Sequence, residues 1–180
     1  MVGTDAIVTS DVGQHQMWAA QAFPFSFAPV ADVRRARHHG LGLPAAIGAA
    51  LAQPHRTVVC FTGDGSLLMN VQELATAAEE GTNVKIVLLN NGHLGMVRQQ
   101  QQLFYGARYH ASRFHAEPDF AAIARGFGIA AHDLGAAGEI DTSCRWRARC
   151  AAPARVSSTC RSLPRRTSIR WCRPAAPAAS

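Results

Sequence analysis

The chain has 180 residues, of which 48% are hydrophobic, and this length allows one domain with a sizeable core. Its formal charge of +6 is unevenly divided: residues 1–140 carry nine Lys and Arg against eleven Asp and Glu, whereas 141–180 carry nine Arg against Asp141 alone. A basic nucleic-acid-binding surface is therefore excluded for the main part of the chain. The sequence shows neither a signal peptide nor an apolar run of membrane-spanning length, so we expect a cytoplasmic protein without a membrane anchor.

Strand and helix patterns alternate along the chain. The predicted strands share short β-branched, aliphatic or aromatic runs that end at turn residues, and they are 6–10, 57–61, 84–89 and 127–130. Helices are predicted at 43–52, 71–78 and 119–126, where apolar residues recur at helical spacing, and at the glutamine-rich segment 97–105. This alternation predicts an α/β domain over 1–140, in which helices flank a parallel sheet.

The segment 57–89 has the pattern of strand, helix and strand. Such a unit is nearly always a right-handed crossover between parallel strands, so residues 63–66 and 90–96 should meet at one edge of the sheet. Open α/β sheets bind ligands at that edge. Asp64 and Asn91 offer the oxygen ligands that Mg²⁺ prefers, and the backbone N–H groups of Gly65 and Ser66 would attract a diphosphate. Each motif alone is typical of a simple turn, but together they predict a metal–diphosphate site.

These motifs resemble a known family. Gly63-Asp64-Gly65 followed by Asn90-Asn91 is similar to the signature of thiamine-diphosphate enzymes. The flanking segments resemble the large, catalytic subunit of acetolactate synthases, and they are 11–21, 42–49, 69–76 and 94–99. The resemblance covers roughly residues 6–27 and 40–139. It implies the thiamine-diphosphate-binding fold and, within the full protein, the last of three domains.

The resemblance also implies site residues. It places the cofactor, thiamine diphosphate, against Gln14, His15, Gly65, Ser66, Leu94, Gly95 and Met96, and it places Mg²⁺ against Asp64, Asn91 and His93. Many family members carry a tryptophan facing the second substrate where this chain has Gln100, which implies a weaker preference for 2-oxobutyrate over pyruvate. No catalytic residue is expected in this chain, because the family's cofactor-activating glutamate belongs to an N-terminal domain of a neighbouring subunit.

The function implied is that of a transferase that joins two pyruvates into 2-acetolactate with loss of CO₂, in branched-chain amino-acid biosynthesis. The family implies a homo-oligomer of large subunits with a regulatory small subunit. These 180 residues alone are expected to be inactive. Two alternatives stay open: a non-catalytic product of a damaged gene, and a basic nucleic-acid-binding protein.

Residues 28–39 break the resemblance. They read Ala-Pro-Val-Ala-Asp-Val-Arg-Arg-Ala-Arg-His-His, where the family has a segment like Arg-Gln-Trp-Leu-Thr-Ser-Gly-Gly-Leu-Gly-Thr-Met-Gly. One set of synonymous codons for the first string encodes the second when it is read one nucleotide later. We therefore interpret 28–39 as an out-of-frame insert that replaces a loop contacting the cofactor's rings. This interpretation disfavours a phosphate- or metal-binding role for its Arg and His residues.

The segment 141–180 is rich in Arg, Ala, Pro, Ser and Cys without a sustained period, which predicts disorder. Suitable codons for 156–174, read two nucleotides later, encode a strand followed by the family's Pro-Met-Val-Pro-Pro ending. We therefore predict that this segment too is translated out of frame and that the sheet lacks its last strand. Its four cysteines have no zinc-site spacing, whereas Cys60 lies in a strand and is predicted to be a core residue.

Overall fold

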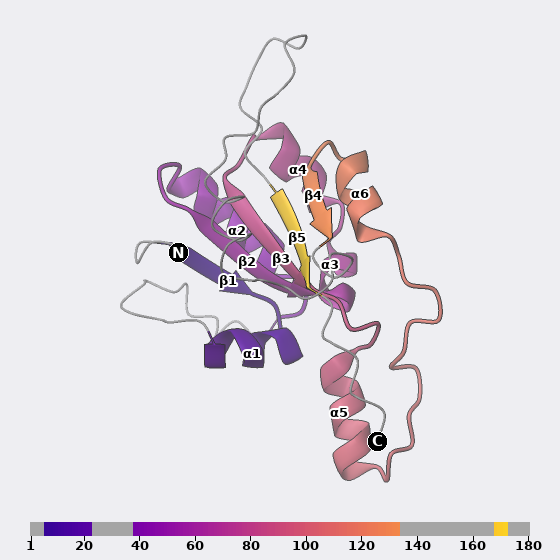
Figure 1. Cartoon of the computed structure of the whole chain (residues 1–180). Coiled ribbons are helices and arrows are strands. Elements are labelled where there is room, and N and C mark those ends of the chain that lie inside the picture. Colours follow the sequence, from indigo (N-terminus) through magenta and orange to yellow (C-terminus); the bar gives the residue numbers. More distant parts are fainter. Residues whose placement is uncertain (1–5, 23–37, 134–167, 173–180) are drawn as a thin grey trace.

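The computed structural model describes residues 6–22, 38–133 and 168–172 (Figure 1). The strands are β1 (Ile7–Ser10), β2 (Val58–Gly63), β3 (Val84–Leu89), β4 (Ala130–Asp133) and β5 (Ser168–Cys172). The helices are α1 (Gln14–Ala22), α2 (Gly42–Ala52), α3 (Asp64–Met69), α4 (Glu73–Glu79), α5 (Gly95–Phe104) and α6 (Phe120–Gly126). The strands form one parallel sheet in the order β1-β2-β3-β5-β4, which confirms the predicted fold class.

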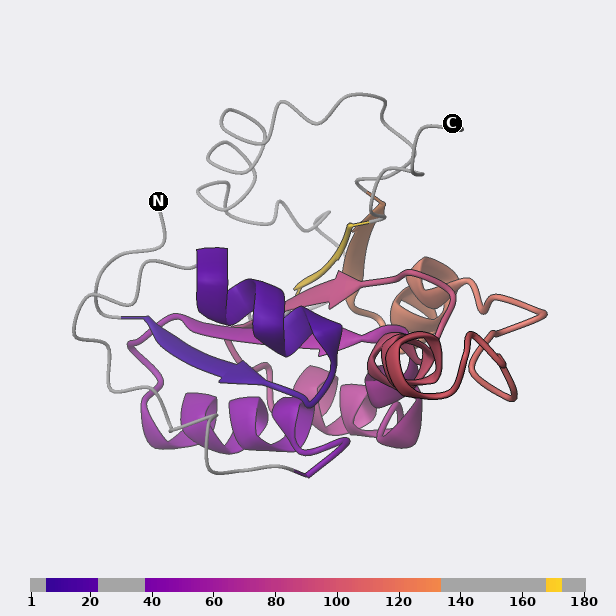
Figure 2. The same cartoon turned by 90° about the horizontal axis from the view of Figure 1, so that it is seen from below.

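Helices cover both faces of the sheet. Figure 2 shows α1 on one side of β1 and β2 and α2 on the opposite side; α2 contacts both strands, and α1 contacts β2. On the α2 side, α4 packs beside α2, and α6 packs against β4. In Figure 1, α5 lies beyond the carboxyl ends of the strands, and none of its residues is buried. Among the described residues, no helix is long and apolar enough to span a membrane.

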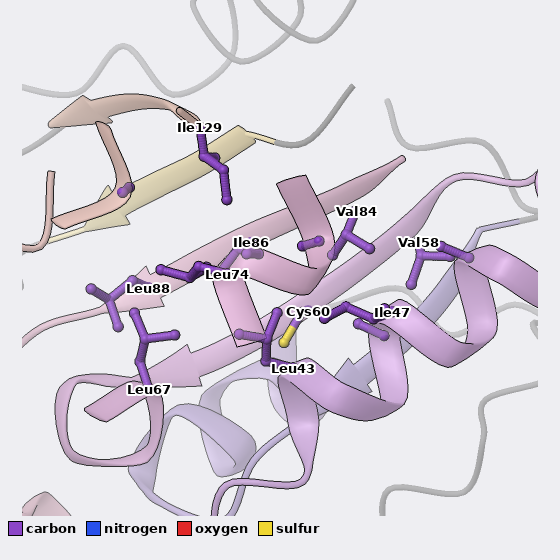
Figure 3. Packing of buried hydrophobic residues seen from close by; sticks show 14 of the residues in the cluster. Leu43, Ile47, Val58, Cys60, Leu67, Leu74, Val84, Ile86, Leu88 and Ile129 are labelled. Carbon is purple, nitrogen blue, oxygen red and sulfur yellow. The ribbon is translucent and has the colours of Figure 1, made fainter. Parts of the chain in front are cut away.

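The main core lies between the sheet and α2 (Figure 3). Because side chains alternate along a strand, every second residue of β2 and β3 faces this layer, and Cys60 of β2 lies in register with Ile86 of β3. Both side chains are fully buried, and Leu43 and Ile47 of α2, which pack in the same core, are less than 5% exposed. Cys60 is therefore a core residue, as predicted, and its burial raises the pKa of the thiol to about 12.

The helix ends follow local residue chemistry. Gly81 takes a φ of +57° just after α4, the left-handed conformation that ends helices, and this confirms the predicted end at 79–81. At α6, the Asp119 carboxylate accepts a hydrogen bond from the Ala122 N–H (2.9 Å) and caps the first turn. The strand predicted at 127–130 begins only at Ala130, because Phe127 and Gly128 still bond to the last turn of α6.

Three elements lie outside the predicted ranges, namely α1, the short helix α3 that precedes α4, and β5. Residues 14–22 form α1, in a segment for which only the cofactor contacts of Gln14 and His15 were expected. Residues 168–172 form β5 between β3 and β4, so the sheet has a further strand where none was predicted; for the rest of 141–180, disorder stays a prediction. The sequence Ser-Ile-Arg-Trp-Cys alternates as strands do, and it pairs with the edge of β3 that would otherwise leave backbone groups unpaired. The rest of 141–180 and the segment 28–37 lie outside the described residues.

Candidate functional site

A cavity of about 280 Å³ lies at the carboxyl edge of the sheet, where the turns after β1, β2 and β3 meet. All of the residues predicted to contact the cofactor or the metal line it, and they are Gln14, His15, Asp64, Gly65, Ser66, Asn91, His93, Leu94, Gly95 and Met96. The parallel crossover from β2 to β3 brings these residues to one edge, as predicted. Gln100, the predicted substrate residue, is exposed on α5 and does not line the cavity.

Asp64 starts α3 at the base of the cavity and is 5% exposed. Its Oδ1 accepts a hydrogen bond from the Gly65 N–H (2.7 Å), whereas its Oδ2 is buried and has no hydrogen-bond partner among the described residues. Burial raises the pKa of this carboxyl, and surrounding backbone N–H groups oppose that rise. A buried carboxylate oxygen without a partner is unfavourable by itself, so the site fits a cation at this position.

Opposite Asp64, residues 90–93 form a tight turn held by two asparagine side chains. Asn90 Oδ1 accepts from the Gly92 N–H (3.0 Å), and Asn91 Oδ1 accepts from the His93 N–H (3.1 Å). Gly92 has a φ of +68°, and a Cβ built there would lie 2.6 Å from Glu117 Oε1. The positive φ therefore favours glycine at this position of the turn that places Asn91 at the cavity, whereas the Glu117 side chain could move aside.

His15 lies in the first turn of α1 and is 6% exposed. Its ring packs against two glycines: a Cβ on Gly63 would lie 2.7 Å from His15 Nδ1, and a Cβ on Gly13 would also collide with the ring. Burial lowers the pKa of His15 to about 4, so the imidazole is neutral at pH 7. Its Nε2 is buried without a hydrogen-bond partner among the described residues and can bond to a ligand in the cavity.

The donor set suits a hard cation that also binds phosphate. Among residues 6–22, 38–133 and 168–172, no group of three or more His, Cys, Asp or Glu could hold a metal alone. One carboxylate with a free oxygen and one asparagine amide instead match Mg²⁺, which keeps positions for phosphate oxygens and water. Asp64 and Asn91 therefore fit a magnesium-bound diphosphate better than zinc.

Comparison with protein families matches residues 11–148 to the thiamine pyrophosphate enzyme, C-terminal TPP binding domain. The chain belongs to this family. The large subunit of acetolactate synthase isozyme 1 from Escherichia coli is 51% identical over 142 residues, which cover 74% of this chain and 24% of that protein. The acetolactate synthase large subunit of Parasynechococcus marenigrum is 53% identical over 129 residues, or 69% of this chain and 20% of that protein. The chain thus spans about a quarter or less of the length of these curated relatives.

Both the cavity and the relatives support the resemblance inferred from the motifs. The described residues that line the cavity include all of those predicted to bind the diphosphate and the metal. The segment expected to meet the cofactor's rings, 28–39, falls largely outside the described residues: only His38 and His39 are described, both are exposed, and His39 lines the cavity.

Asp11 is a buried site residue to which the sequence analysis gave no role. Its Oδ1 accepts from the Gly42 N–H and its Oδ2 from the Thr62 hydroxyl, each at 3.0 Å, so it ties the ends of β1 and β2 to the start of α2. Asp11 is 1% exposed, and burial raises its pKa while these hydrogen bonds oppose the rise. Its position in the sequence could have indicated this role, because an acidic residue that is buried at the end of an apolar strand needs hydrogen-bond donors around it.

Replacing His15 should change how the stability of this domain depends on pH. Because folding lowers the pKa of His15 from 6.5 to about 4, the unfolded chain binds more protons between these values, and stability falls as pH falls through that window. As pH falls from 6.5 to 4, the free energy of unfolding of the parent should decrease by about 3 kcal/mol more than that of His15→Gln. Urea denaturation of both proteins in metal-free buffer measures this difference. Parallel pH dependence in the two proteins would contradict the burial argument.

Proposed function

We propose that this chain is the cofactor-diphosphate-binding part of an acetolactate synthase-like carboligase. The observation that supports it best is the convergence on one cavity of the unpartnered Asp64 Oδ2 and of Asn91, in a chain about half identical to acetolactate synthase large subunits. Asp64, Asn91 and His93 would hold Mg²⁺. The N–H groups of Gly65 and Ser66 would bind the diphosphate, with Gln14, His15, Leu94, Gly95 and Met96 against the rest of the cofactor.

The proposed reaction joins two pyruvates into 2-acetolactate with release of CO₂, in branched-chain amino-acid biosynthesis in the cytoplasm. Thiamine diphosphate, when bound, supplies the nucleophilic carbon and the electron sink for this chemistry. The protein's part is to hold the diphosphate through Mg²⁺ and to keep His15 neutral beside it. The proposed partners are further copies of a large subunit and a regulatory small subunit.

Titration calorimetry tests the proposed site. Thiamine diphosphate should bind the 180-residue chain in the presence of Mg²⁺ and should lose that binding in EDTA. Thiamine, which lacks the diphosphate, serves as the control and should not bind measurably, whereas inorganic diphosphate should compete. Binding that does not depend on Mg²⁺, or no binding, would contradict the proposal.

A non-catalytic gene product is the second candidate, and the replaced segment 28–39 favours it. The nucleotide sequence of the locus tests this candidate. It is supported if the alternative frames over 28–39 and 156–174 encode family-like segments. If neither frame does so, the chain's own sequence is the selected one, and the basic segment 141–180 becomes a candidate nucleic-acid-binding arm.

The proposed role of Gln100 is to limit the preference for 2-oxobutyrate over pyruvate. A tryptophan at this position would offer a wider apolar surface to the extra methylene, which is worth about 1–3 kcal/mol. The test uses a full-length relative that carries this chain's residues 95–104. There, Gln100→Trp should raise the ratio of product formed from 2-oxobutyrate to product formed from pyruvate by about tenfold or more. An unchanged ratio in a competition assay would refute this role.

A further inference from the structure

Three side-chain amides form a chain that joins α5, α1 and the turn after β3. Gln14 Nε2 donates to Gln99 Oε1 (3.1 Å), and Asn91 Nδ2 donates to Gln14 Oε1 (3.2 Å). The residues are separated by 85 and 77 positions along the chain, and all three are partly buried. Two of them line the cavity, whereas Gln99 stands behind Gln14 and does not.

The backbone of the turn after β3 determines which atom donates and which accepts in each of these hydrogen bonds. The His93 backbone N–H can only donate, so the Asn91 atom that faces it must be the oxygen Oδ1. The Asn91 NH₂ group must then donate to Gln14 Oε1, which leaves the Gln14 NH₂ group to find an acceptor. Gln99 Oε1 is that acceptor, and it completes a chain in which every bond has the same direction.

The start of α5 is shaped to hold this chain. Gly95 and Gln99 are four residues apart, so they lie one above the other on the same face of the helix. A Cβ on Gly95 would collide with Gln14 Oε1 and would lie 2.8 Å from Asn91 Nδ2. Glycine therefore makes room for the Gln14–Asn91 contact, and Gln99 closes over it one turn later. Since α5 has no buried residue, this contact is a specific link between the helix and the cavity.

We propose that Gln99 is a positioning residue for the metal site. It acts through Gln14, whose carbonyl oxygen accepts a hydrogen bond from the Asn91 NH₂ group. This bond and the one from the His93 N–H together hold the Asn91 amide, and the second lone pair of Asn91 Oδ1 is left for the cation. This inference rests on the proposed role of Asn91 as a Mg²⁺ ligand. Without an acceptor at position 99, Gln14 is free to rotate, and the Asn91 amide is then held only by the hydrogen bond from the His93 N–H.

Variants that differ in hydrogen-bonding capacity test this role. Gln99→Leu removes the acceptor without adding a charge and should weaken the apparent Mg²⁺ affinity, measured by calorimetry with saturating thiamine diphosphate, by about 10–100-fold. Gln99→Glu keeps an acceptor and should restore the affinity. The matched control is Gln102→Leu, because Gln102 is an exposed residue of the same helix with no role in the cavity. An equal loss in Gln99→Leu and Gln102→Leu, or no loss in either, would overturn the proposal.

A second measurement needs no cofactor. In the free chain, NMR should show the side-chain NH₂ resonances of Asn91, identified by their disappearance in Asn91→Asp, moving in Gln99→Leu and staying in place in Gln102→Leu. Unmoved Asn91 resonances in Gln99→Leu would refute the hydrogen-bonded chain whatever the calorimetry shows. If the parent fails to bind Mg²⁺ and thiamine diphosphate while the resonances move as expected, the proposed function fails and the positioning of Asn91 by Gln99 stands.

Discussion

Incubated with pyruvate, thiamine diphosphate and Mg²⁺, the 180-residue chain should form no detectable acetolactate. Binding a diphosphate does not ionise the reactive carbon of the cofactor, which needs a proton acceptor of its own. Among the described residues that line the cavity, Asp64 is the only carboxylate, and it is assigned to Mg²⁺. The neutral His15, with its low pKa of about 4, is a weak base. A colorimetric assay for acetolactate measures the product.

The positive control for this assay is the Escherichia coli isozyme 1 large subunit, which is 51% identical to this chain where the two align. This relative should form acetolactate in the same assay, which shows that the assay detects the product. Product formation by the 180-residue chain above the background without protein would contradict the prediction. It would also mean that a residue of this chain takes the role assigned to the glutamate of the N-terminal domain.

Replacing Asp64 should have opposite effects on binding and on stability. Asp64→Asn keeps the shape of the side chain but removes its charge, and it should weaken Mg²⁺-dependent binding of thiamine diphosphate by at least about 100-fold; Asp64→Ala should abolish it. Without ligand, Asp64→Asn should be more stable than the parent by roughly 1–3 kcal/mol, because the parent buries a carboxylate oxygen without a partner.

The pH dependence gives the sign of this stability difference. Burial raises the pKa of Asp64 above its ordinary value of 3.8, so ionising it costs free energy in the folded chain. The advantage of Asp64→Asn should therefore be full at neutral pH and should disappear as pH falls through the raised pKa toward 3.8. The control is Asp119→Ala, which removes the cap of α6 away from the cavity; it should lower stability by about 1 kcal/mol and leave binding unchanged. Unchanged binding in Asp64→Asn would count against the metal assignment.

The elements predicted best from the sequence are those with a clear apolar period. The strand predicted at 84–89 matches β3, and 43–52 matches α2 to within one residue. The cavity followed from the same reasoning, because a crossover places the turns at 63–66 and 90–96 at one edge. Helix α1 was missed because its residues, Gln-His-Gln-Met-Trp-Ala-Ala-Gln-Ala, show no apolar stripe that would indicate a helix.

Residues that hold the cavity-lining elements in place without lining the cavity themselves were harder to predict. Asp11 and Gln99 act through contacts with residues 31 to 85 positions away, and no local pattern indicates such partners. Trp18 and Met69 line the cavity for the same kind of reason, since the fold brings α1 and the end of α3 to one place. Strand β5 was missed because five alternating residues are a weak signal inside a segment rich in Arg, Pro and Ser.

The position of β5 has a consequence for synthesis of the chain. Strand β4 joins the sheet only through β5, which lies between it and β3, yet Ser168 follows Asp133 by 35 residues. At a translation rate of about 5–20 residues per second, roughly 2–7 s separate these two points on the ribosome. During that interval the nascent chain exposes the open edge of β3, where another polypeptide could pair. Among the described strands, the last to be made is thus the one that covers this edge.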